Sequence, residues 1–158
     1  MSFSINFSPA PVQTMNVIQQ TQQTQQPQQA KQFNPHDTAK EFCGIYYSAM
    51  ASKGLASILY LFDQNVMCNY GGKEYTGMYN TMITMATDGI SKLCYDKLNG
   101  VMLPLVNSSS ISVQVTGLCQ GVTFWNQLTA VYTFSETFIL TALSDGTIRV
   151  SGYSFKLI

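Results

Sequence analysis

Residues 132–141 read YTFSETFILT, and this stretch decides the class of fold. Its large apolar side chains, at Tyr132, Phe134, Phe138 and Leu140, alternate with hydroxyl-bearing ones at Thr133, Ser135, Thr137 and Thr141. Because successive side chains of a β-strand point to opposite faces, this period of two predicts a long strand with one apolar face. Glu136 falls on that apolar face. A carboxylate buried there needs a partner or a raised pKa; in the alternative arrangement, Glu136 faces a wet dimer interface.

The segments on either side of this strand repeat the alternation. Ile111, Val113 and Val115 share one parity, which predicts a half-buried strand. In the last segment the apolar parity of residues 148–150 is opposite to that of residues 153–157, with the change at Gly152. Such a change predicts a bulge or bend, a device that a strongly curved sheet requires.

The remaining strands are shorter or less regular. Residues 93–105 form a possible strand with an irregularity at Gly100. Residues 65–70 and 73–76 are expected to form a short hairpin around Gly71-Gly72.

Helical patterns occupy the part of the chain before most of these strands. Asn34 is a predicted N-cap with Pro35 at the first helical position, and apolar residues then recur at helical spacing as far as Lys53-Gly54. A short helix over residues 55–62 and a methionine-rich helix from Gly77 to near Gly89 follow. Helices on one face of a mostly antiparallel sheet define an α+β fold.

The N-terminal part has a different composition. Residues 13–32 contain ten glutamines and few large apolar side chains. We therefore expect residues 1–33 to be a disordered Gln-rich tail and residues 34–158 to be one domain. The tail is interpreted either as a solubilising segment or as a tether for self-association. Phe3 and Phe7 could dock as a short linear motif, or belong to an unattached terminus.

Composition excludes several classes of function. The eight basic residues are scattered singly among eight acidic ones, which argues against direct nucleic-acid binding. The four cysteines form no CxxC pair and have no histidine at ligand spacing, so we expect no metal and no cofactor. No secretory signal and no apolar run of membrane-spanning length is present. The expected location is therefore inside the cell, in the cytoplasm, the nucleus or both.

Five phrases of the sequence, in this order, resemble the nuclear transport factor 2 (NTF2-like) family. They are EFCGIYY at 41–47, LFDQNVMCNYGG at 61–72, YTG at 75–77, SVQVTG at 112–117 and FSETFIL at 134–140. The resemblance implies a cone, in which a strongly curved, mostly antiparallel sheet packs on three N-terminal helices. Within this family the phrases resemble those of the transport factor itself and of the NTF2-like domain of stress-granule proteins that bind a RasGAP SH3 domain.

These relatives imply a non-catalytic, homodimeric interaction domain for transport or ribonucleoprotein assembly. The dimer would use the outer sheet face, including residues 127–140, and the ligands would be Phe-Gly-type peptide motifs. By position, the peptide groove would be lined by Phe42, Leu61 and Phe138, although both phenylalanines also suit an ordinary core. The acids with which the family binds Ran are replaced by Gly71 and by the acid-free loop 120–125, which argues against Ran binding.

An enzymatic function is the alternative, because cone-shaped relatives include isomerases and dehydratases. Such enzymes place a base and a hydrogen-bond donor in an apolar cavity. Tyr46 is the candidate donor, and Asp96 or Glu136 is the candidate base. The single histidine, His36, lies in the first turn of a predicted helix and is expected to play a capping role. We therefore expect a binding module rather than an enzyme.

Overall fold

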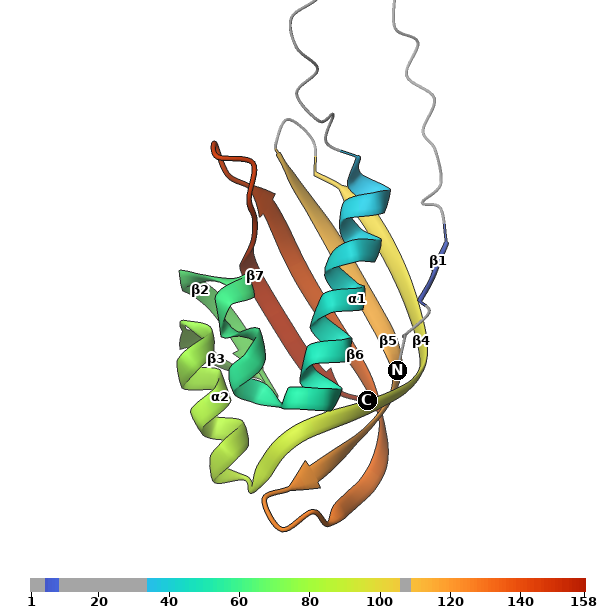
Figure 1. Cartoon of the computed structure of the whole chain (residues 1–158), viewed down its shortest axis with the longest axis vertical. Coiled ribbons are helices and arrows are strands. Elements are labelled where there is room, and N and C mark those ends of the chain that lie inside the picture. The colour runs from blue at the N-terminus through green and yellow to red at the C-terminus, as the bar shows by residue number, and fades with distance from the viewer. Residues whose placement is uncertain (1–4, 9–33, 106–108) are drawn as a thin grey trace, which may run out of the picture.

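The structure is a computed structural model that describes residues 5–8, 34–105 and 109–158. In chain order the elements (Figure 1) are β1 (Asn6–Ser8), α1 (Pro35–Lys53), the 3-10 helix η1 (Leu55–Leu61), β2 (Phe62–Tyr70), β3 (Lys73–Thr76), α2 (Met78–Thr87), β4 (Ile90–Pro104), β5 (Ser110–Thr123), β6 (Leu128–Ala142) and β7 (Ile148–Leu157).

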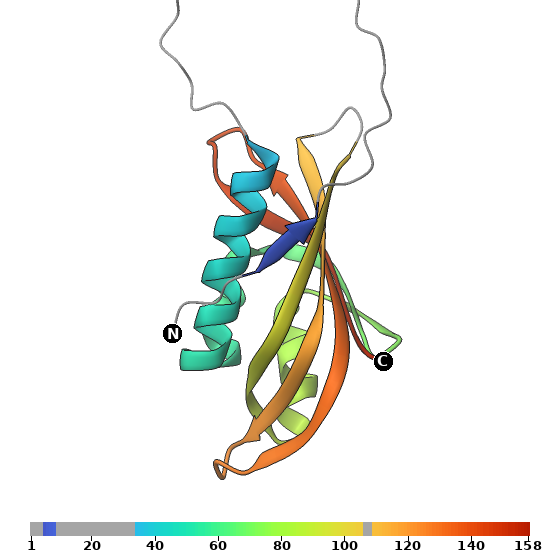
Figure 2. The ribbon, with the colours of Figure 1, turned by 90° about the vertical axis from the view of Figure 1, so that its right-hand side faces the viewer.

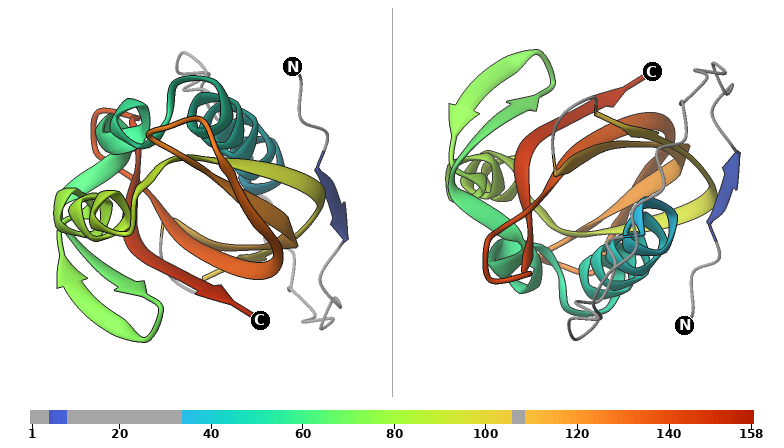
Figure 3. Two further views of the ribbon diagram at one scale, coloured as in Figure 1. Left: turned by 90° about the horizontal axis from the view of Figure 1, so that it is seen from below. Right: turned by 90° about the horizontal axis from the view of Figure 1, so that it is seen from above.

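In the described residues the strands form one seven-stranded sheet in the order β1-β4-β5-β6-β7-β2-β3. Neighbouring strands run antiparallel except for the pairs β1–β4 and β2–β7, which are parallel. The sheet curves around α1, which packs against β4 and β5, while α2 packs against β2, β3 and β4 (Figures 2 and 3). The expected α+β class and the curved, mostly antiparallel sheet are thus confirmed.

The start and end of α1 follow the local sequence. The side chain of Asn34 accepts hydrogen bonds from the backbone N–H groups of His36 (3.0 Å) and Asp37 (3.2 Å), as the N-cap prediction requires. Gly54 ends the helix with a φ of 83°, a left-handed conformation that favours glycine. A side chain at Gly54 would also meet the Ser91 carbonyl oxygen at 2.6 Å, so this position fixes how α1 meets β4.

The predicted change of phase in the last strand is confirmed. Ile139 pairs with Gly152 while the next residue, Leu140, pairs with Val150, so Ser151 is an extra residue in β7. This bulge lets side chains on both sides of it, Val150 and Tyr153, point into the core.

The position of the irregularity in β4 differs from the expectation. The irregularity in β4 is not at Gly100, which pairs regularly, but between Asp96 and Asn99, where Lys97 adopts a φ of 52°. The second helical segment is present as expected and is a 3-10 helix, a form common in short connectors such as the seven residues of η1.

For the N-terminal segment, both docking and an unattached terminus were expected as alternatives. Residues Asn6–Ser8 form β1, which pairs with Asn99, Gly100 and Val101 at the edge of β4. The segment β1 is therefore part of the folded unit. Phe3 and the glutamine-rich residues 13–32 lie outside the described residues.

The core fills the space between α1 and the concave face of the sheet. Its largest fully buried members are aromatic: Tyr46, Tyr47, Phe134 and Phe138. No helix in the described part of the chain is both long and apolar enough to cross a membrane.

Candidate functional site

A cluster of one carboxyl group and three phenols lies in the middle of this core. Tyr46 and Tyr47 come from α1, Glu136 from β6 and Tyr153 from β7. The hydroxyls of Tyr46 and Tyr153 donate to Oε1 of Glu136 at 2.7 and 2.6 Å, and the hydroxyl of Tyr47 donates to Oε2 at 2.7 Å. We call these four residues the Glu136 cluster.

Local structure explains how these four side chains converge. Tyr46 and Tyr47 are consecutive, yet both are fully buried, because both belong to the one apolar stripe of α1 that faces the sheet, together with Phe42, Cys43 and Met50. Glu136 shares strand parity with Phe134 and Phe138, as its position in the sequence predicts. Tyr153 reaches the same space because the β7 bulge shifts its parity.

Burial controls the electrostatics of the cluster. Glu136 has 0 % exposure, and loss of water raises its pKa to about 7, although the three phenolic hydrogen bonds oppose that rise. Burial, followed by the nearby Glu136 charge, raises the pKa values of all three tyrosines well above their ordinary range. The tyrosines are therefore neutral hydrogen-bond donors, and the carboxyl changes protonation near pH 7.

Two further polar side chains border the Glu136 cluster. Burial, and then the charge of Glu136, raises the pKa of the Cys43 thiol, so this cysteine is protonated and unreactive. The ring of Tyr95 packs edge-on against Tyr47, with centroids 4.7 Å apart. Its hydroxyl lies near Tyr46 but is buried without a hydrogen bond of normal geometry.

The structure brings together two of the three proposed cavity residues. Tyr46 and Glu136 are hydrogen-bonded, but Asp96 is solvent-exposed at the β4 irregularity, where its carboxylate accepts from the Lys97 N–H at 2.8 Å. Sequence reasoning did not assign Tyr47 or Tyr153 to this site. The paired tyrosines on α1 and the phase change at Gly152 were the signals that could have identified them.

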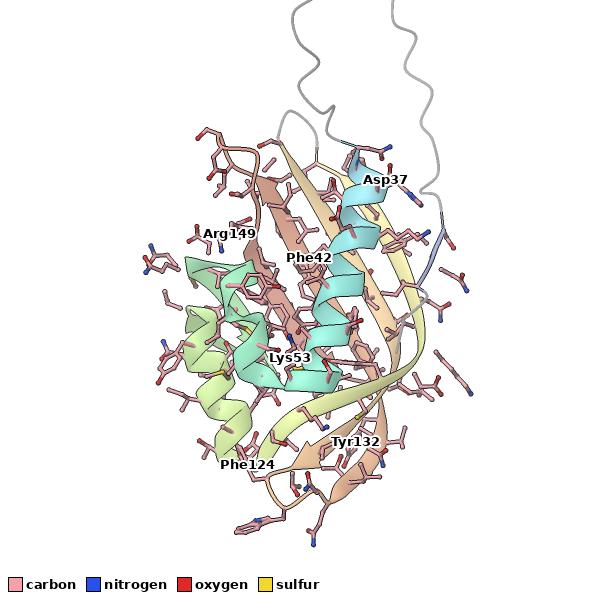
Figure 4. The ribbon with its side chains drawn as sticks, viewed as in Figure 1. Asp37, Phe42, Lys53, Phe124, Tyr132 and Arg149 are labelled. Atoms are coloured by element: carbon pink, nitrogen blue, oxygen red, sulfur yellow. The ribbon has the colours of Figure 1, made fainter. Side chains whose placement is uncertain are left out.

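The three residues proposed for a peptide groove lie in the core. Phe42, which projects from α1 (Figure 4), meets Phe138 edge to face with ring centroids 5.0 Å apart. Phe138 is fully buried, and Phe42 and Leu61 are 6 % and 9 % exposed. In this structure a peptide could reach them only if α1 or η1 moved, so the groove at these residues stays a prediction.

A second candidate site lies where β1 meets β4. Phe7 pairs with Gly100, and the side chains of Ile5 and Phe7 lie on the concave side, next to α1. The ring of Phe7 lies 6.0 Å from the ring of His36, centroid to centroid. Ile5 is only 8 % exposed and belongs to the core. We call the β4 backbone at Asn99, Gly100 and Val101, with the space above Gly100, the β4 edge site.

Other surface features of the described residues lack a comparable set of interacting side chains. A pocket of about 370 Å³ lies beside Tyr70, Gly71 and Phe155, near the end of β7. Gly71 has a φ of 59°, which suits the hairpin turn that was predicted there. Within the described ranges no group of three or more histidine, cysteine, aspartate or glutamate side chains could hold a metal ion.

Comparison with known proteins gives the class of fold. No protein-family model matches the sequence, and no curated protein matches it significantly. Solved structures do match. Nuclear transport factor 2 from Cryptosporidium parvum has a TM-score of 0.58 at 14 % identity, over 78 % of this chain and 94 % of that one. The C. albicans Mtr2–Mex67 M domain complex has a TM-score of 0.61 at 10 % identity, over 78 % and 94 %.

The same fold also occurs in a different functional class. A Shewanella frigidimarina protein provisionally assigned as a ketosteroid isomerase matches with a TM-score of 0.52 at 15 % identity, over 75 % of this chain and 94 % of that one. The chain therefore has an NTF2-like fold, which transport factors share with isomerase-like proteins. At these identities the likeness defines the fold, and function has to be argued from the sites.

Proposed function

We propose that this domain is a non-catalytic, dimeric protein-interaction module that binds extended phenylalanine-containing segments at the β4 edge site. One observation carries the proposal: the chain's own segment Ile5–Ser8 occupies that site as an added strand. Addition of a strand to a sheet edge is a common mode of peptide recognition, in which backbone hydrogen bonds give affinity and alternate side chains give specificity.

The site has a specific place for a phenylalanine ring. A Cβ atom built on Gly100 would lie 2.6 Å from Cε1 and 2.9 Å from Cδ1 of Phe7, so the ring occupies space that any other residue at position 100 would fill. A residue two positions earlier, here Ile5, enters the core beside α1. The expected ligand is therefore an extended segment with an apolar residue, a spacer and a phenylalanine.

This proposal keeps the ligand class implied by family resemblance and changes its location. Ser8, which follows Phe7, is exposed, so the site accepts a small residue after the phenylalanine, as in Phe-Gly-type motifs. A groove at Phe42, Leu61 and Phe138 would instead require core residues to separate. The β4 edge site needs only an incoming strand.

Burial of the Glu136 cluster argues against the enzymatic alternative. One observation favours an isomerase or dehydratase: a carboxyl with a pKa of about 7 lies beside tyrosine donors, which is the equipment of a cone-cavity base. However, Glu136 has no exposed surface, and both of its oxygens already accept hydrogen bonds. A substrate would have to displace a tyrosine from each oxygen that it approached.

We also propose that the outer face of the sheet forms the homodimer. Between Lys97 and Glu136 the sequence contains no charged residue, and this span supplies all of β5 and much of β6. Depletion of charge is a feature of interface cores. The exposed apolar side chains of this span include Val131, which shares the strand parity of Thr133 and Ser135 on the outer face, and Phe124, at the tip of the β5–β6 hairpin (Figure 4).

We propose the cellular context from the family resemblance. The likeness of the sequence phrases to those of the transport factor and of stress-granule proteins supports a role in nucleocytoplasmic transport or ribonucleoprotein assembly, in the cytoplasm, the nucleus or both. The scattered basic residues favour protein rather than nucleic-acid ligands. Gly71 and the acid-free loop 120–125 argue against Ran as a partner.

An NMR titration of the full chain with a phenylalanine-containing peptide tests the proposed function. Saturable shifts at Asn99, Gly100 and Val101 are expected. The matched control is Gly100→Val, which fills the space of the phenylalanine ring with a residue that favours strands. Shifts centred on Leu61 instead would move the site to the groove predicted from resemblance, and a fully unresponsive spectrum would refute peptide binding.

A further inference from the structure

We infer that the N-terminal segment β1 is a built-in competitor: it occupies the β4 edge site and must leave before the same kind of segment from another protein can bind there. This inference rests on the proposed function, because it concerns the regulation of the same site. The partner to which it commits is an extended segment with an apolar residue, a spacer and a phenylalanine.

The strand β1 covers only a small part of the β4 edge. Three residues of β1 pair with Asn99, Gly100 and Val101, whereas β4 itself runs from Ile90 to Pro104. The strand β5, in contrast, pairs with β4 along nearly its whole length, from Ile90 to Pro104. A contact of three residues can open without disturbing the rest of the sheet, because local stability follows the extent of buried and hydrogen-bonded structure.

The β4 edge site matches β1 in side chains as well as in backbone. Phe7 fills the space above Gly100, and Ile5 joins the core with its Cγ2 atom 3.1 Å from the place that a Cβ atom on Gly100 would take. Both contacts need only a side chain of the right kind at alternate positions. An unrelated segment with the same two side chains would therefore make the same contacts, and it would compete directly with β1.

A long stretch of chain connects β1 to α1. The ring contact of Phe7 with His36 places the end of β1 next to the start of α1, while residues 9–33 join them along the chain. A segment of that length can span up to roughly 80 Å when extended, far more than this contact requires. The connection therefore tethers β1 to the site without forcing it to stay there, and tethering gives it a high effective concentration.

The consequence is a reduced apparent affinity for outside ligands. When only a fraction of the molecules has a free site, the apparent dissociation constant rises by the inverse of that fraction. If β1 occupies the site in nine molecules out of ten or more, releasing it should tighten peptide binding by about 10-fold or more.

The test measures binding of a fluorescein-labelled peptide MSFSINFSPAP, which has the sequence of residues 1–11, to three forms of the full chain by fluorescence anisotropy. The forms are the unchanged protein, the arm-released double variant Ile5→Ser/Phe7→Ser, and that double variant with Gly100→Val added. Competition predicts binding about 10-fold or more tighter to the double variant than to the unchanged protein. It predicts loss of that binding in the triple variant.

The outcomes separate the two proposals. Equal affinity of the unchanged protein and the double variant would overturn competition by β1 but leave the proposed binding function standing. If neither form binds the peptide, both proposals are wrong. A second measurement is needed in case a variant folds poorly. It uses a protein whose only change is Ser4→Cys, labelled there with a dye: added peptide should displace β1 and change the fluorescence of the dye. A lack of change at saturation would also overturn competition.

Discussion

The hydroxyl of Tyr153 donates to Oε1 of Glu136 at 2.6 Å, and this contact depends on the bulge at Ser151. Without the extra residue, Tyr153 would lie on the face of the strand opposite to that of Val150 and would point away from the core. The bulge thus serves two purposes, since it curves the sheet and completes the set of donors around a buried carboxyl. The Glu136 cluster joins α1, β6 and β7 through side-chain hydrogen bonds alone.

Stability should fall as pH rises through the pKa of Glu136. Burial raises this pKa from 4.5 to about 7, so the folded protein holds the proton more tightly than the unfolded chain does. The stabilisation is complete below pH 4.5 and is lost as pH approaches and passes 7. At 1.36 kcal/mol for each pKa unit, the loss is about 3 kcal/mol. Urea unfolding of the full chain between pH 5 and pH 8.5 measures it.

Glu136→Gln is the matched variant for this pH dependence. The amide cannot ionise, so its unfolding free energy should be nearly constant across the same range. At pH 5 the variant should be less stable than the unchanged protein by roughly 1–3 kcal/mol, because the amide nitrogen cannot accept a phenolic hydrogen bond. The difference should shrink at pH 8.5. Parallel pH curves for the two proteins would mean that Glu136 does not control the stability.

Removal of single phenolic hydroxyls should have unequal effects. Oε1 of Glu136 accepts from both Tyr46 and Tyr153, whereas Tyr47 is the donor to Oε2. Tyr47→Phe therefore leaves an oxygen without that donor and should cost about 2–3 kcal/mol, while Tyr46→Phe should cost about 1 kcal/mol. Chemical denaturation at pH 7.5, with the exposed Tyr79→Phe as control, measures both. Equal costs would show that the donors are interchangeable.

Tyr95→Phe should behave in the opposite way. The hydroxyl of Tyr95 is buried without a hydrogen bond of normal geometry, so the folded protein bears the cost of removing it from water. Its removal should leave stability unchanged or raise it by about 1 kcal/mol. The melting temperature, compared with that of Tyr47→Phe, reports the sign. A clear loss of stability would indicate that the hydroxyl has a partner, such as a buried water molecule.

The sequence predicted regular elements well because their signals are local. The N-cap at Asn34 and the alternation in residues 132–141 depend on neighbours along the chain, and the structure confirms both. Glu136 was recognised because a carboxylate on an apolar strand face conflicts with its surroundings. A residue that breaks the local pattern in this way marks either a functional site or a buried hydrogen-bond network.

The missed features depend on contacts between distant segments. Asp96 has suitable strand spacing, but the irregularity beside Lys97 leaves it in solvent. From the sequence, Gly100 was expected to interrupt a strand. In the structure it makes room for Phe7, more than ninety residues earlier in the chain. Phe42 and Phe138 were placed in a groove by resemblance, yet they pack against each other. No local pattern carries this information.

The proposed dimer gives a final prediction about the outer sheet face. Gln114 of β5 and Thr137 of β6 are register partners on that face, within or next to the charge-free span. In a twofold interface each substitution enters twice, so Thr137→Lys would place two like charges in a region that lacks acids to pair with them. We expect the dimer dissociation constant to rise at least about 10-fold, measured by sedimentation equilibrium.

Gln64→Lys on the exposed side of β2 is the control and should leave the dimer intact, because β2 lies away from the proposed interface. A dimer that tolerates Thr137→Lys as well as Gln64→Lys would place the interface elsewhere, and a monomer at all concentrations would remove the dimer from the proposed function while leaving the β4 edge site untouched.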